Sequence, residues 1–105
     1  MNITKESITS EILIEFKERM RLGDEEDNNL KRILLSSLQA LIKVCGDYDI
    51  LTDETFKELV FERSRYAYND SLEYFNDNFL SMINSLGIAK ALDEIALEGD
   101  VNAEI

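Results

Sequence analysis

Four adjacent acidic residues, at positions 24–27, are the first candidate for chemistry in this chain, because calcium binds carboxylate oxygens. A calcium loop of the EF-hand type also needs a glycine at its sixth position and a glutamate at its twelfth. Counted from Asp24, these two positions hold Asn29 and Leu35. We therefore expect no metal site here and interpret the segment as an acidic turn whose last residues cap the following helix.

The groups that most enzymes use near neutral pH are missing or poorly placed. The chain has no histidine, which is the usual general base and a common metal ligand, and it has one cysteine, Cys45. One cysteine excludes an internal disulfide and a cysteine-cluster zinc site. A reactive thiol needs a nearby cation, and the nearest charges, Lys43 and Asp47, give no clear activation. We expect Cys45 to be a small buried apolar residue, and we expect no enzyme activity and no cofactor.

Composition favours a soluble, acidic, single domain. Of the 105 residues, 45% are hydrophobic and 31% charged, as in ordinary globular proteins. No apolar run approaches the ~20 residues of a membrane span and no leader is visible, so we expect a protein that stays in the cytoplasm unless a particle carries it out. Lys and Arg number 11 against 22 for Asp and Glu, and the net charge of −11 argues against binding of nucleic acid.

Hydrophobic periodicity predicts an all-α bundle of four to five helices. Apolar residues spaced by four predict a first helix over about 7–22, which Gly23 ends in the left-handed conformation. A leucine stripe predicts a second helix over about 28–45, which Gly46 ends.

A long central helix over about 52–76 is expected to organise this bundle, because residues 52–86 hold seven of the nine aromatic residues. Asparagine and aspartate have weak helix propensity, so the helix could bend or end at 69–70 or at 76–78, and they are concentrated at 76–78. We therefore expect the central helix to be interrupted there.

A short fourth helix over about 79–86, ended by Gly87, and a fifth helix within 88–97 complete the predicted bundle. These helices form one domain, residues 1–97. The acidic segment 98–105 has no periodicity, so we expect a flexible tail that becomes ordered when it binds a partner.

Two stripes of residues run along the central helix, and each needs a neighbour. One stripe is made of large side chains. The other has small residues between larger ones, which allow a second helix to approach closely; it consists of Val60, Ser64, Ala67, Ser71 and Tyr74. Either both stripes are buried inside one domain, or one packs within the subunit and the other against a second copy.

Arg63 is the charge that most needs a partner. None of its helical neighbours at three and four residues can pair with it; these are Leu59, Val60, Tyr66 and Ala67. Its guanidinium therefore reaches water or an intrachain carboxylate, or it contacts another subunit or a partner. Together with nearby tyrosines, which are common at interfaces, it defines a candidate interface of Arg63, Ser64, Tyr66, Ala67, Asn69, Asp70, Ser71 and Tyr74.

Two segments of the chain carry a family resemblance. Residues 58–79, ELVFERSRYAYNDSLEYFNDNF, and residues 24–46, DEEDNNLKRILLSSLQALIKVCG, resemble the head-tail connector proteins of long-tailed bacteriophages. These are also called adaptor or head-completion proteins, and the likeness is greatest to those of phages that infect Gram-positive bacteria.

The resemblance implies a viral structural protein of the virion, located at the head-tail junction after assembly in the host cytoplasm. In that family, all-helical subunits form a twelve-fold ring beneath the portal protein. The ring extends the DNA channel and is the platform for a head-completion (stopper) protein or the tail, while the isolated subunit could be a monomer. The C-terminal segment commonly reaches toward the portal, which here would use Ile88, Leu92, Ile95, Val101 and Ile105.

Two hypotheses of other classes stay open. An acidic protein could mimic DNA and inhibit a host nucleic-acid-binding enzyme, but this needs carboxylates spaced along one exposed surface. Many of the acids here cluster in turns and in the tail. Alternatively, the chain is a helical interaction module that works as a dimer.

Overall fold

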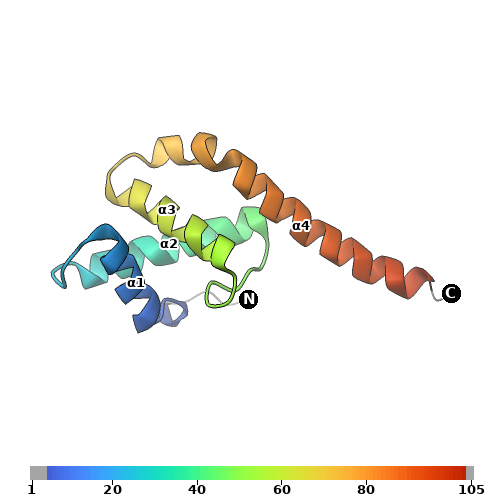
Figure 1. The fold of residues 1–105 in the computed structure, drawn as a ribbon, viewed down its shortest axis with the longest axis horizontal. Helices are drawn as coiled ribbons and strands as arrows, with labels where there is room; N and C mark the ends of the chain where they lie inside the picture. Colours follow the sequence, from blue (N-terminus) through green and yellow to red (C-terminus); the bar gives the residue numbers. More distant parts are fainter. Residues whose placement is uncertain (1–4, 104–105) are drawn as a thin grey trace.

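The computed structural model describes the backbone of residues 5–103 and the side chains of residues 6–96. This part of the chain contains helices and their connections but no strand, which confirms the predicted all-α fold (Figure 1). The helices are η1 (Lys5–Ser7), α1 (Ser10–Met20), α2 (Asp27–Cys45), α3 (Glu54–Tyr68), η2 (Leu72–Tyr74) and α4 (Phe75–Ala103), where η marks a short 3-10 helix.

The hydrophobic core is built around α2, against which α1, α3 and the first half of α4 pack. The predicted leucine stripe of α2 faces this core. Its members and the aromatic residues from the other helices are almost completely buried; they include Leu30, Leu34, Leu38, Leu41, Phe16, Phe56 and Phe75. The second half of α4 projects away from the bundle (Figure 1), so that the molecule measures 59 × 29 × 19 Å.

The first helix is shorter than its predicted range of 7–22. Its N-terminus is capped by the Thr9 hydroxyl, which accepts a hydrogen bond from the Ile12 amide over 3.2 Å. It ends at Met20, and the C-cap residue Arg21 takes the left-handed conformation with φ 58°, so the prediction that Gly23 would do so is wrong. The reversal comes early because the next residue, Leu22, turns back to pack against the core.

The second helix agrees with its predicted range to within one residue. It ends at Gly46, whose φ of 101° is accessible to glycine without strain. The amide of Gly46 donates to the carbonyl of Ile42 over 3.0 Å, which satisfies one of the last carbonyls of the helix.

The central helix ends earlier than the predicted 52–76. Helix α3 stops at Tyr68, and Asp70 adopts the left-handed conformation with φ 56°. The amide of Ser71 then donates to the Tyr66 carbonyl over 2.9 Å and closes the turn. The interruption expected at 76–78 is therefore wrong, and those residues lie in the first turn of α4.

The expected fourth and fifth helices are one helix. Helix α4 has 29 residues, about 44 Å at 1.5 Å per residue, and it passes through Gly87 without a break. A Cβ atom on Gly87 would lie 3.0 Å from the Val44 carbonyl oxygen, so this glycine allows α4 to approach the end of α2 closely. The backbone of α4 continues to Ala103, into the segment predicted as a tail, and residues 104–105 lie outside the described range.

Candidate subunit and partner interface

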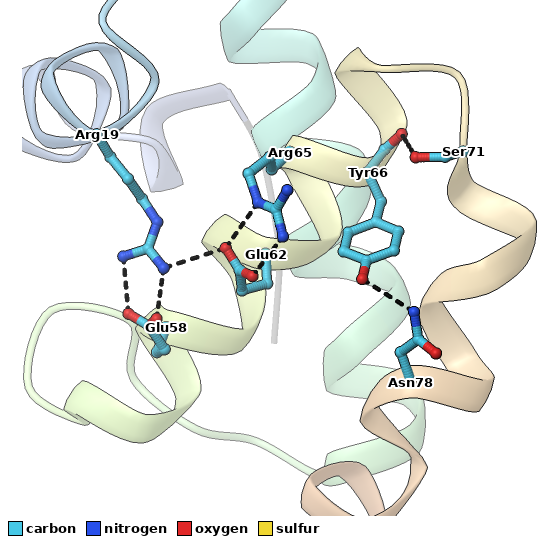
Figure 2. Close-up of polar contacts among 7 residues, drawn as sticks. All are labelled: Arg19, Glu58, Glu62, Arg65, Tyr66, Ser71 and Asn78. Atoms are coloured by element: carbon cyan, nitrogen blue, oxygen red, sulfur yellow. Dashed lines mark hydrogen bonds and ion pairs between the residues drawn. The ribbon is translucent and has the colours of Figure 1, made fainter.

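A network of two arginines and two glutamates joins α1 to α3 (Figure 2). The Arg19 guanidinium bridges both acids, with Nη1 2.8 Å from Glu58 Oε2 and Nη2 3.1 Å from Glu62 Oε2. Arg65 donates to the same Glu62 from Nε at 3.1 Å and from Nη2 at 2.8 Å. Hydrogen bonds from Arg65 and then Arg19 hold the pKa of Glu62 below its ordinary value. Arg65 is thus satisfied by Glu62, one turn back on its own helix.

Arg63 lacks such a carboxylate. Its Nη1 donates to the Ser37 hydroxyl on α2 over 3.2 Å, and its side chain is half-buried. No ion pair joins it to an acid among residues 6–96, so one of the predicted alternatives, an intrachain salt bridge, is absent from that range. Burial lowers the pKa of Arg63, because no opposite charge offsets the loss of water. A contact with another subunit stays a prediction.

The stripe of small residues begins inside the fold. Val60 and Ser64 are both 0% exposed, and the Ser64 hydroxyl has no hydrogen-bond partner in the described part of the chain. Ser64 therefore has no surface to offer to a second copy in this conformation, and the structure removes it from the predicted interface. Ala67 and Ser71, further along the stripe, are half-buried.

The turn between α3 and α4 brings several of the other predicted residues together. The Tyr66 ring packs edge-on against Phe75 and Phe79, with ring centroids 5.8 and 5.7 Å away. Its hydroxyl accepts a hydrogen bond from Asn78 Nδ2 over 3.0 Å, and its carbonyl accepts one from the Ser71 hydroxyl over 3.2 Å (Figure 2). Tyr66 is thus largely used within its own chain.

The residues at the tip of this turn face solvent. Asn69 and Asp70 are exposed, and the Tyr74 side chain is 60% exposed. These three remain candidates for contact with a partner, together with the half-buried Arg63.

The projecting half of α4 presents an apolar face. Ile88, Leu92 and Ile95 are 60%, 58% and 61% exposed, and their spacing of four and three places them on one side of the helix. Ile83 and Leu86, which pack against the core, lie on the opposite side by the same geometry. The side chains of the other two predicted portal-facing residues, Val101 and Ile105, lie outside the described residues.

Besides the close approach of α4 to α2 at Gly87, a contact with Tyr48 holds α4 against the bundle, and the sequence does not predict it. The Tyr48 hydroxyl donates to the Leu86 carbonyl over 2.6 Å, and the Lys90 ammonium lies 4.4 Å from the centroid of the Tyr48 ring. A lone tyrosine in an acidic loop carries no sequence signal for this role. Past Lys90, every side chain up to residue 96 is exposed.

The chemistry available elsewhere is limited. Cys45 is 1% exposed, and burial raises the pKa of its thiol, which disfavours the reactive thiolate. Within the described side chains, no group of three potential metal ligands is close enough to hold an ion. No described helix is long and apolar enough to cross a membrane.

Comparisons with protein families, with curated proteins and with solved structures gave no match to this chain. Any function therefore has to be argued from the chain's own surfaces: the exposed turn between α3 and α4, the half-buried Arg63, and the apolar face of the projecting helix.

Proposed function

We propose that this chain is a structural protein of a phage virion, a head-tail connector adaptor. In this proposal, copies of the chain form a ring under the portal protein, extend the DNA channel and provide the platform for a completion protein or the tail. The observation that carries the proposal is the projecting half of α4 (Figure 1), on which Ile88, Leu92 and Ile95 are mostly exposed.

That helical segment is poorly supported by its own fold. Isolated helices of this length are marginally stable in water, and most helical stability in proteins comes from packing of an apolar face. The apolar face of Ile88, Leu92 and Ile95 points away from the core. An exposed apolar stripe on a projecting element is typical of an interaction site, so we assign this face to contact with the portal.

The charge of the chain fits a place beside a DNA channel. A surface with net charge −11 repels passing phosphates and does not retain them. A component of a channel wall needs this property, because DNA has to pass without binding.

The decisive experiment mixes the purified chain with the portal protein of its phage and measures particle mass by light scattering and shape by electron microscopy. We expect a ring of chains on the portal, whether or not the chain alone is a monomer. The double variant Ile88→Asp, Leu92→Asp should lose portal binding while its circular dichroism stays helical. Ile14→Asp, which changes an exposed apolar residue of α1, is the matched control and should bind.

Two results would contradict the proposal. A chain that stays a monomer or dimer in the presence of portal does not act as an adaptor. A chain that ignores portal and instead blocks a DNA-binding host enzyme would be a DNA mimic.

A further inference from the structure

The solvent face of α2 is basic in an otherwise acidic protein. From residue 28 to residue 46 the chain has three cations and no acid. All three cations are exposed, and none has an ion pair with a described carboxylate. Helical spacing places them on one side of α2 with other exposed residues and the half-buried Leu35; this basic face consists of Asn28, Lys31, Arg32, Leu35, Gln39 and Lys43.

The turn between α3 and α4 has the opposite character. From residue 66 to residue 89 the chain has three acids and no cation. These acids, Asp70, Glu73 and Asp77, are exposed and have no ion pair in the described structure. We call residues 70–77 the acidic corner.

The two surfaces lie on different sides of the molecule. The core-facing residues of α2, such as Leu34 and Leu41, lie on the side of α2 against which α3 and α4 pack. Arg32 and Lys43 are about half a helical turn away from them, so these two cations point away from α3 and α4, while Lys31 lies at the edge of the basic face. One copy can therefore use its basic face and its acidic corner at the same time.

We propose that the basic face of α2 is the docking surface for the acidic corner of a second copy of this chain. The proposal rests on the self-assembly in the proposed function and names the two surfaces that would meet. Its support is charge complementarity: three cations without an ion pair face three acids without an ion pair, in a protein whose net charge of −11 otherwise drives copies apart.

Both surfaces also carry apolar groups suited to the centre of a contact. In the acidic corner, Leu72 is 37% and Tyr74 60% exposed, and tyrosine is enriched at interfaces. On the basic face, Leu35 is half-buried beside a hollow of about 330 Å³ that Asn28, Lys31 and Arg32 also line. An aromatic side chain from the corner would fit into this hollow, with the charges forming a rim.

A contact between two different surfaces of identical chains is head-to-tail, and it produces a ring when the rotation between copies closes. This is the geometry that a connector needs. A nucleic acid is the less suitable occupant, because the acidic remainder of the chain repels phosphate over distances of about a Debye length, ~8 Å at physiological ionic strength.

The test uses two full-length charge-reversal variants. The first carries Lys31→Glu and Arg32→Glu, and the second carries Glu73→Lys and Asp77→Lys. Self-association is followed by sedimentation velocity at low ionic strength, and carbodiimide cross-linking of mixed ¹⁴N- and ¹⁵N-labelled chains identifies which lysines and carboxylates meet between copies. The control is Glu11→Lys with Glu18→Lys, which reverses two exposed acids of α1.

Each variant alone should associate about tenfold more weakly than the natural chain, since like charges then face each other. An equimolar mixture of the two variants should recover association, because each supplies the surface that the other has lost. The control changes the net charge as the second variant does, and it should not associate more weakly than the natural chain. In the natural chain, Lys31 should cross-link to Glu73 or Asp77 of another copy.

Unchanged association in both variants, or no recovery on mixing, would overturn this inference. The same holds if the natural chain neither associates nor gives these cross-links, or if the basic face instead binds a short DNA duplex. Ring formation on portal by Lys31→Glu, Arg32→Glu at natural levels would reject this contact and leave the connector role intact. A natural chain that self-associates through these surfaces but does not bind portal would support this contact and reject the connector role.

Discussion

Arg63 donates a hydrogen bond to the neutral hydroxyl of Ser37, 3.2 Å away, and to no carboxylate among the described residues. A half-buried cation with this environment loses part of its hydration without gaining an opposite charge. Residues that cost stability in the free protein often serve a function, so this pair bears directly on the proposed assembly.

We predict that Arg63→Met stabilises the free chain. Methionine keeps the apolar stem and removes the uncompensated charge, so the free energy of unfolding in urea should rise by about 0.5–1 kcal/mol. Ser37→Ala should destabilise the natural chain by about 0.5–1 kcal/mol through the lost hydrogen bond, yet change little in the Arg63→Met background. The same Arg63→Met variant should assemble less well than the natural chain. A loss of stability in Arg63→Met would mean that Arg63 is already satisfied in its own fold.

The close approach of α4 to α2 at Gly87 gives a second prediction. Alanine at this position should gain up to about 1 kcal/mol from helix propensity, but its Cβ would lie 3.0 Å from the backbone oxygen of Val44, which cannot move freely. Overpacking of this kind costs about 1–3 kcal/mol, so we expect Gly87→Ala to lower the free energy of unfolding by about 1 kcal/mol.

Asn84→Ala is the control for Gly87, since Asn84 is exposed on the same helix. It should raise the free energy of unfolding by about 0.5 kcal/mol through propensity alone. Equal gains in both variants would show that α4 can separate from α2 without cost.

These contacts explain which parts of the fold the sequence could predict. The bounds of α2 could be predicted closely, because its leucine stripe and Gly46 indicate the same helix that packing in the core requires. The end of α3 was missed because residues 69–70 and 76–78 have similar local preferences, and burial of Phe75, which is 1% exposed, decides between them. Likewise, Gly87 looks like a helix end in sequence, and its contact with Val44 is visible only in three dimensions.

The candidate interface could also be predicted only in part, because some of its features depend on packing in three dimensions. The absence of a local partner for Arg63 follows from helical spacing, and the described structure places no acid beside it. The complete burial of Ser64 depends on how α3 packs, which spacing alone does not give. The bridge from Arg19 to Glu58 and Glu62 joins residues far apart in the chain, so neither helix alone predicts it.

The last prediction concerns acid stability and Glu62. The pKa of this carboxyl is lowered in the folded chain from an ordinary value of 4.5, so its ionised form stabilises the fold. A lowered pKa gives a contribution that is complete above the pKa of the unfolded chain and is lost as pH falls through the folded value. The stabilisation by Glu62 should therefore be full at neutral pH and disappear progressively below pH 4.5.

Glu62→Gln tests this sign directly. At neutral pH the variant should be less stable by about 1–2 kcal/mol, because Arg19 and Arg65 lose a shared charged acceptor that is only 14% exposed. The difference should shrink as the pH is lowered in urea titrations, until both chains unfold alike in strong acid. Glu18→Gln, which changes an exposed acid of α1 without an ion pair to a described residue, is the control and should leave the free energy of unfolding at neutral pH unchanged. If Glu62→Gln lowers the free energy of unfolding by the same amount from neutral to acid pH, the cause is packing. The charge network would then not be what holds α1 to α3.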